Sequence, residues 1–137
     1  LERYTSATAI IRMAKEAVKE NPDCAIMKKG NGDVDRINAK TVIDAAKEND
    51  PVGVKVFEQY TDYLAMACNN VIQFLDPDMV VLGGGVSYAG EFLVDAVRRK
   101  VPNYILNKNL PYSEIKLAQL RNEAGIIGAA LLGRAAE

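Results

Sequence analysis

The stretch from Pro51 to Leu75 constrains the fold more than any other part of this 137-residue chain. No helix-breaking residue follows Gly53, and apolar side chains recur every three or four positions from Val56 onward. Proline is favoured in the first turn of a helix, and the sequence Asp-Pro-Asp directly after Leu75 stops the pattern. The sequence therefore predicts one long amphipathic helix that acts as the spine of the domain.

Two further helices are predicted before this spine. The opening residues place apolar side chains on one helical face, with Thr5 or Ser6 as the candidate cap and Asn21 as the stop. Asn38 is the candidate cap of a short helix that ends before Pro51. Between these helices, residues 24–37 are rich in Gly, Asn and Asp and are predicted to form a loop.

Two short strands and two more helices are predicted after the spine. The apolar run Met79–Leu82 is typical of a strand that is buried on both faces, and the alternation over residues 115–120 indicates a second strand. After the glycines a helix is expected that carries Phe92, Leu93, Ala96 and Val97 and ends in Arg98-Arg99-Lys100. A last helix is expected over residues 123–136, with small residues that allow close packing against a neighbour. This order of elements predicts the α/β class, although two strands are few for a chain of this length.

The composition excludes several classes of function. The chain has no histidine, so it offers neither a Ser-His-Asp or Cys-His relay nor an imidazole metal ligand. Cys24 and Cys68 lie far apart, which favours free structural thiols over a metal site. The net charge of −1 argues against nucleic acid as the main partner. No apolar run is long enough for a membrane span and no signal-peptide layout is present, so a cytoplasmic location is expected.

Three consecutive glycines, Gly83 to Gly85, follow the first predicted strand. Backbone without side chains can approach a phosphate or a flat base closely, and ligands of open α/β sheets lie at the carboxyl ends of the strands. Tyr88 stands where the dinucleotide fingerprint needs its third glycine, and Glu91 stands where a phosphate loop needs lysine. The residues alone leave two interpretations open, a turn that touches a ligand and a purely structural sharp turn.

Three segments carry a family resemblance: LERYTSATAI at residues 1–10, DPDMVVLGGGVS at residues 76–87 and NEAGIIGAA at residues 122–130. In this order they resemble the C-terminal part of the ROK family, the sugar kinases and sugar-responsive repressors of the actin-like ATPase superfamily. Within the family, the chain is most similar to bacterial glucokinases. The resemblance implies a helix-rich C-terminal fragment of an actin-like ATPase (ribonuclease H-like) domain with two short parallel strands.

The resemblance also implies which residues bind ligands. Glu2 corresponds to the glutamate after the family's zinc motif, which accepts hydrogen bonds from sugar hydroxyls. Gly83, Gly84 and Gly85 correspond to the turn that lies against the adenosine and phosphates of the nucleotide, and Thr8 falls near the adenosine side. No catalytic residue and no metal ligand is expected in this chain, because the family's catalytic aspartate and zinc ligands lie upstream of the matching part.

For a longer parent protein, the resemblance implies an ATP-dependent hexose kinase that transfers a phosphoryl group from ATP with Mg²⁺ to the sugar 6-hydroxyl. Structural zinc is expected in the parent. Residues 1–137 are expected to be a single partial domain without kinase activity when isolated. A homo-oligomer is expected because a short sheet leaves an open edge, whereas no nucleic acid and no membrane is expected to bind this lobe.

Two other functions remain open at this point. In a transcriptional repressor of the same family, this lobe would sense sugar while an upstream winged helix binds DNA. The sequence upstream of the lobe decides between them, since a kinase needs an aspartate-glycine phosphate turn there and a repressor needs a helix-turn-helix. A self-contained assembly domain without any ligand is the second alternative.

Overall fold

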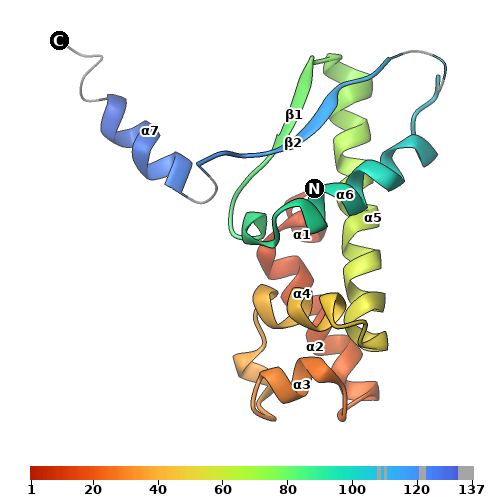
Figure 1. Ribbon diagram of the computed structural model, residues 1–137, viewed down its shortest axis with the longest axis vertical. Helices are drawn as coiled ribbons and strands as arrows, with labels where there is room; N and C mark the ends of the chain where they lie inside the picture. Colours follow the sequence, from red (N-terminus) through yellow and green to blue (C-terminus); the bar gives the residue numbers. More distant parts are fainter. Residues whose placement is uncertain (108, 110, 121–122, 133–137) are drawn as a thin grey trace.

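The computed structural model describes residues 1–107, 109, 111–120 and 123–132 (Figure 1). Its helices are α1 (Glu2–Thr5), α2 (Ala7–Glu20), α3 (Ala25–Lys29), α4 (Ala39–Lys47), α5 (Pro51–Leu75), α6 (Glu91–Lys100) and α7 (Ala124–Leu132), and its strands are β1 (Met79–Leu82) and β2 (Glu114–Leu117). Helices α2, α3 and α4 gather around the first half of α5, whereas α6 and the two strands lie along its second half (Figure 1). The expected helix-rich α/β fold with two short parallel strands is confirmed.

Helix α5 is the predicted spine, and both of its ends have a local cause. Asp50 precedes it, and one carboxylate oxygen, Oδ1, accepts a hydrogen bond from the Gly53 N–H at 2.8 Å. Pro51 occupies the first turn, where its missing N–H costs nothing. At the other end Asp76 adopts a left-handed conformation with φ 45°, which turns the chain out of the helix. These contacts fix a 25-residue helix to which the other elements are attached.

The predicted caps of the two earlier helices are present, but the first predicted helix is interrupted at Ser6. Ser6 is extended, and its hydroxyl accepts a hydrogen bond from the Ala9 N–H at 3.1 Å, so α2 begins at Ala7. The residues before Ser6 form the separate short helix α1. Asn38 and Thr41 form a reciprocal capping box at the start of α4, in which each side chain accepts a hydrogen bond from the other residue's backbone N–H.

The loop predicted over residues 24–37 is wrong in part, because this segment contains α3 and a 3-10 turn over Val34–Arg36. The cause lies outside the segment. The second carboxylate oxygen of Asp50 accepts a hydrogen bond from the Ala25 N–H at 3.0 Å, and Ile26 is fully buried in the core beside α4. A cap supplied by a residue far along the chain cannot be found in the local sequence.

The two strands pair in parallel, with Met79 opposite Glu114 and Leu82 opposite Leu117. The second strand is shorter than predicted, and the first is not buried on both faces. Val80 and Leu82 pack toward the core, whereas Met79 and Val81 are 41% and 54% exposed. Among the described residues no element covers the outer face of β1, which explains the difference from a strand inside a complete sheet.

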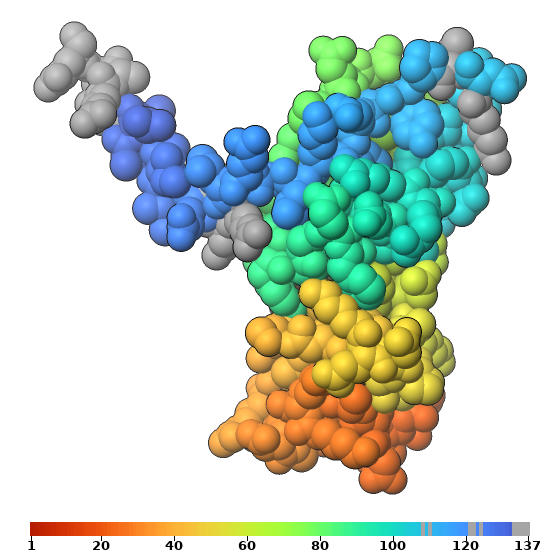
Figure 2. Space-filling model, viewed as in Figure 1, coloured from red at the N-terminus to blue at the C-terminus, as the bar shows by residue number. Residues whose placement is uncertain are grey.

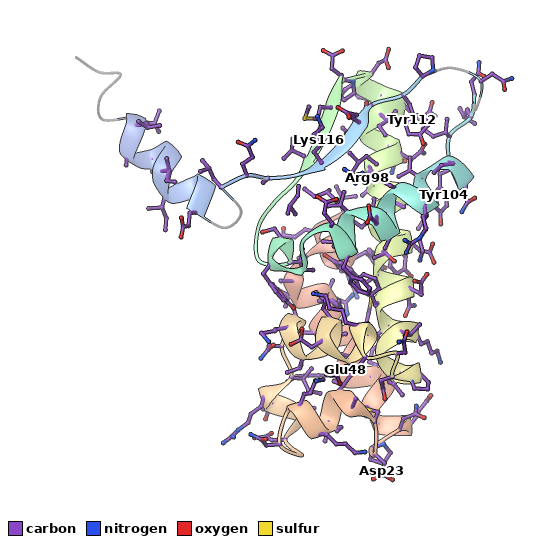
Figure 3. The ribbon with its side chains drawn as sticks, viewed as in Figure 1. Asp23, Glu48, Arg98, Tyr104, Tyr112 and Lys116 are labelled. Atoms are coloured by element: carbon purple, nitrogen blue, oxygen red, sulfur yellow. The ribbon has the colours of Figure 1, made fainter. Side chains whose placement is uncertain are left out.

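A buried side chain and an arginine hold the strands to the helices. Ile115 packs into the core formed by the second half of α5 and by α6. The Nε of Arg98 on α6 donates to the Ile115 carbonyl at 2.8 Å, and its Nη1 lies 2.9 Å from the Glu91 carboxylate (Figure 3). At the same helix end the Lys100 Nζ lies 2.7 Å from the Glu58 carboxylate of α5. These contacts hold β2 against α6 and hold α6 against α5.

The last helix differs from its prediction, because its two glycines do not meet a neighbour. Figures 1 and 2 show α7 standing away from the body on the segment that follows β2. A Cβ added at Gly125 or Gly128 would meet no atom within 4 Å, and Ile126 is 75% exposed. The predicted continuation over residues 133–136 lies outside the described residues. Nowhere in the described chain is a helix both long and apolar enough for a membrane crossing.

Candidate functional site

The turn after β1 presents open backbone at the end of the strand. Gly84 has φ +83°, a left-handed conformation that favours glycine, and a Cβ at this position would meet no atom within 4 Å. Ser87 closes the turn, because its backbone N–H and its hydroxyl both donate to the Gly84 carbonyl, at 3.0 and 2.6 Å. The turn is therefore held in one shape by the buried Ser87 while its glycines remain exposed.

A hollow of about 420 Å³ lies beside this turn, and we call it the glycine-turn hollow. It is lined by Gly84, Gly85, Ser87, Tyr88, Gln119, Leu120 and Glu123. Its walls come from the segments that follow the two strands, because the carboxyl ends of parallel strands meet at one edge. Small-molecule sites have volumes of roughly 300 to 1,000 Å³, so the hollow is large enough for a nucleoside.

A second hollow of about 350 Å³ lies where α1 meets α2, and we call it the N-terminal hollow. It is lined by Glu2, Arg3, Ser6, Thr8, Ala9 and Arg12. The Arg12 guanidinium donates to the Arg3 carbonyl at 2.8 Å and lies 5.9 Å from the centre of the Tyr4 ring. This hollow combines a carboxylate, a hydroxyl and positioned guanidinium groups, which suits a ligand with several hydrogen-bonding groups.

The structure separates the predicted ligand residues into these two hollows. Gly84 and Gly85 line the first, and Gly83 precedes them without lining it. Glu2 and Thr8 line the second together. The hollows are close to each other, because a Cβ at Gly85 would lie 3.6 Å from the Cβ of Ala7, the residue before Thr8. Among the described residues, neither hollow holds a hydrogen-bonded pair of nucleophile and base, so this arrangement can bind and orient a ligand.

Five lining residues of the glycine-turn hollow were not identified from the sequence: Ser87, Tyr88, Gln119, Leu120 and Glu123. Three of them, Gln119, Leu120 and Glu123, could have been found from their position after the second strand. Residues that follow the second of two parallel strands lie at the same sheet edge as those that follow the first. The same rule that drew attention to the glycines therefore applies to the segment after β2.

Tyr88 connects the glycine-turn hollow to the core of the helical half. Its ring packs against that core, and its hydroxyl is buried with no hydrogen-bond partner among the described residues. Burial, with a smaller contribution from the nearby Asp44 carboxylate, raises the pKa of the Tyr88 hydroxyl far above its ordinary value. The hydroxyl is therefore neutral, and the residue contributes an uncharged aromatic wall to the hollow.

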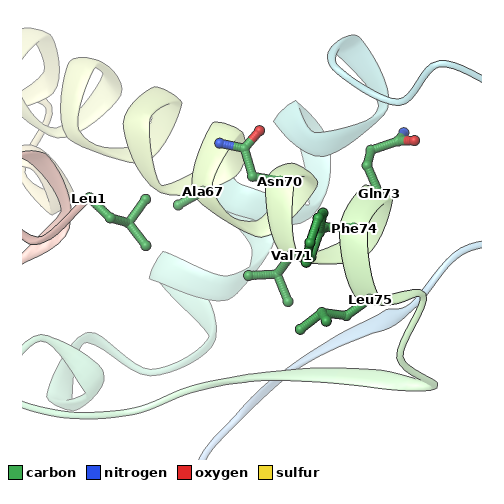
Figure 4. A pocket seen from close by; sticks show the side chains of 7 residues that line it. All are labelled: Leu1, Ala67, Asn70, Val71, Gln73, Phe74 and Leu75. Atoms are coloured by element: carbon green, nitrogen blue, oxygen red, sulfur yellow. The ribbon is translucent and has the colours of Figure 1, made fainter.

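An apolar groove of about 530 Å³ runs along the last turns of α5. Figure 4 shows Leu1 at one end of this groove and Leu75 at the other. Phe74 and Leu75 are 88% and 66% exposed. Large apolar side chains gathered in this way are typical of a surface that another protein segment covers.

The described residues contain no group of three or more His, Cys, Asp or Glu side chains that fits a metal ion. Both cysteines are buried as free thiols, and burial raises the pKa of Cys68 to about 11. The carboxylate of Asp35 is paired with the Lys15 ammonium at 2.8 Å. The zinc that the resemblance implies has no donor set in this part of the chain.

The family model described as ROK family matches residues 1–136. The glucokinase of Thermotoga maritima is 35% identical over 130 residues, which cover 95% of this chain and 41% of that protein. A more distant relative, the xylose repressor of Caldicellulosiruptor bescii, is 23% identical over 93% of this chain and 32% of its own length. The chain thus spans less than half the length of the curated relatives that it matches.

A solved structure shares the fold. The crystal structure of a ROK family glucokinase from Streptomyces griseus in complex with glucose and AMPPNP superposes with a TM-score of 0.90 at 31% identity. The superposition covers 98% of this chain and 44% of that one. Family match, sequence identity and fold agree over practically every residue, and this chain therefore belongs to the ROK family.

Proposed function

We propose that residues 1–137 form a single partial domain, the C-terminal lobe of a longer ATP-dependent hexose kinase of the glucokinase type. The observation that carries this proposal is the glycine-turn hollow, an exposed glycine turn at the carboxyl ends of two parallel strands. Open α/β sheets bind their ligands at this place. The fold is shared with a glucokinase that was solved with glucose and AMPPNP.

In this proposal the lobe binds and orients both substrates. Gly83, Gly84 and Gly85 allow the nucleotide to approach the backbone. Thr8, which the resemblance puts near the adenosine, lines the N-terminal hollow beside Glu2, on the other side of Gly85. Glu2 accepts hydrogen bonds from sugar hydroxyls, since an ionised carboxylate offers two acceptor oxygens. Mg²⁺ arrives with the nucleotide as part of the substrate.

Phosphoryl transfer to the sugar 6-hydroxyl then depends mainly on positioning and on charge stabilisation. The catalytic aspartate and the zinc ligands are proposed to belong to the remainder of the parent protein, in the cytoplasm where ATP is available. The isolated chain is accordingly inactive. A coupled assay with glucose and ATP on the pure chain tests this, and turnover above a blank would contradict it.

Gly84 offers a direct test of the nucleotide site because the chain contains a matched control. Gly84 and Gly32 both have positive φ, +83° and +75°, and a Cβ at either would meet no atom within 4 Å. Alanine at either position therefore introduces the same strain, roughly 1–2 kcal/mol, without a clash. Gly32 lies outside both hollows.

We expect Gly84→Ala to weaken binding of AMPPNP at least fivefold and Gly32→Ala to leave it unchanged, as measured by an NMR titration. Equal effects of the two substitutions would refute a nucleotide site at the glycine turn. Absence of binding to the unsubstituted chain would favour an assembly domain without a ligand.

The repressor alternative is supported by the similarity to the xylose repressor of Caldicellulosiruptor bescii. The kinase is favoured, because the identity to the Thermotoga maritima glucokinase, 35%, exceeds the 23% identity to the repressor over a similar share of this chain. The sequence of the parent upstream of this lobe decides between them. A helix-turn-helix there, together with sugar-dependent binding to DNA in a gel-shift assay, would replace the kinase by a repressor.

Self-association of the lobe is also proposed. The apolar groove beside Phe74 and Leu75 and the exposed outer face of β1 supply the apolar surface that an interface needs. Light scattering on the purified chain is expected to give the mass of a dimer or a larger oligomer. A monomer at all concentrations would contradict this.

A further inference from the structure

The glycine-turn hollow has one wall of nearly bare backbone and a second wall of long side chains. The first wall is the turn itself, with Gly84, Gly85 and the ring of Tyr88. The second consists of Gln119, Leu120 and Glu123, on the segment that leads from β2 to α7 (Figure 1). The inference below rests on the proposed function, namely that this hollow takes the nucleoside part of ATP.

Flat ligands with polar edges suit a hollow of this composition. Tyr88 and Leu120 offer apolar surface to the faces of a base. The Ser87 hydroxyl is occupied by the Gly84 carbonyl, and the Tyr88 hydroxyl is buried beside the core. Gln119 and Glu123 are exposed, so they are the lining side chains whose polar groups are available to the edge of the base.

These two side chains differ in what they recognise. The carboxamide of Gln119 can donate or accept, so it adapts to either kind of edge. The ionised carboxylate of Glu123 only accepts. A purine carries at position 6 either an amino group that donates, as in adenine, or an oxygen that accepts, as in hypoxanthine and guanine. A carboxylate that faces position 6 attracts the amino group and repels the oxygen. Because the N1–H of hypoxanthine and guanine also donates, the discrimination requires that the carboxylate contact position 6 and not position 1.

We propose that Glu123 is the residue that restricts this site to 6-aminopurine nucleotides, by accepting a hydrogen bond from the exocyclic amino group. Gln119 supplies a second hydrogen bond that does not discriminate between bases. The phosphates extend toward the glycine turn, where backbone without side chains leaves room for them and no carboxylate lines the wall.

ATP and ITP provide the appropriate comparison, because they differ only in the group at position 6 and the hydrogen at position 1. Their dissociation constants are measured with the full 137-residue chain by NMR titration, with far-UV circular dichroism as the check of folding. We expect the unsubstituted chain to bind ATP about tenfold more tightly than ITP, the effect of one charged hydrogen bond.

Glu123→Gln keeps the size of the side chain and replaces the carboxylate by an amide that accepts from an amino group or donates to an oxygen. This variant is expected to reduce the preference for ATP to about twofold or less, mainly by tighter binding of ITP. Glu114→Gln is the matched control, because Glu114 is an exposed carboxylate on β2 that does not line this hollow. It should retain the tenfold preference.

The outcomes separate this inference from the proposed function. Binding of ATP and ITP with the same preference in the chain and in Glu123→Gln overturns the role of Glu123 and leaves the nucleotide site standing. Absence of binding for both nucleotides overturns the nucleotide site and the inference with it. Loss of the preference in Glu114→Gln as well as Glu123→Gln shows an effect of net charge and also overturns the inference.

Discussion

Replacement of Gly53 by alanine tests how closely α4 and α5 approach each other. A Cβ at Gly53 would lie 2.8 Å from three atoms of α4: the carbonyl carbon and Cβ of Ala45 and the backbone nitrogen of Ala46. Two of these atoms belong to the backbone, so no rotation of a side chain relieves the contact. The substitution can be accommodated only if the two helices move apart.

The magnitude follows from two opposing effects. Alanine in place of glycine inside a helix stabilises it by up to about 1 kcal/mol. Overpacking of a tight contact costs about 1–3 kcal/mol, and contacts with backbone belong at the upper end of this range. We therefore expect Gly53→Ala to lower the free energy of unfolding by about 2 kcal/mol.

Urea unfolding monitored by circular dichroism measures this change, and Gly128→Ala is the control. Gly128 is also helical, but a Cβ there would meet no atom within 4 Å, so only the gain in helix propensity remains. The control should be neutral or stabilising. If Gly53→Ala is also neutral or stabilising, α4 and α5 are not packed as tightly as described and the reasoning is refuted.

Three further predictions concern a cap, a buried hydroxyl and a buried thiol. Asp50 accepts hydrogen bonds from the first turns of both α3 and α5, so Asp50→Ala should destabilise the chain by about 2 kcal/mol in urea unfolding, while Asp23→Ala, at an exposed position, should have little effect. Burial raises the pKa of Tyr60 to about 12. As the pH rises above 10, the hydroxyl therefore loses its proton in the unfolded chain before it does so in the folded chain. This difference should lower the free energy of unfolding by up to about 2.7 kcal/mol between pH 10 and 12. Urea midpoints measured across that pH range check this, and Tyr60→Phe should show a smaller loss. Burial also raises the pKa of Cys68, so iodoacetamide at pH 8 should leave this thiol unmodified in the folded chain and modify it in urea. Peptide mass spectrometry measures the modification. Equal rates of modification in the folded and unfolded chain would contradict the burial of Cys68.

Elements with local signals could be predicted from the sequence. Ser6 and Asn38 occupy the capping positions predicted for them, and Asp76 ends α5 as expected. The glycine turn after the first strand could also be located from the sequence, because strand, glycines and helix follow one another directly along the chain, and its contact with a ligand stays a prediction. In each case the physical cause lies within a few residues of the feature.

Features that depend on distant contacts could not be predicted in the same way. Helix α3 forms because Asp50, far along the chain, accepts its first N–H. The exposure of Val81 depends on which elements lie next to β1, and no pattern within the strand reports that. Glu123 becomes part of the candidate site only through the parallel pairing of the strands, which brings the segments after both to one edge.

The position of α7 has a consequence for any ligand in the glycine-turn hollow. One wall of the hollow belongs to the body and the other to the connection that carries α7, so a bound molecule touches both. A surface that holds α7 in the orientation that suits the ligand will therefore raise the affinity of the hollow. By thermodynamic reciprocity, the ligand strengthens the hold of that surface on α7 by the same factor. Binding of a ligand in the hollow and docking of α7 on a surface are therefore coupled, and each can be measured through its effect on the other.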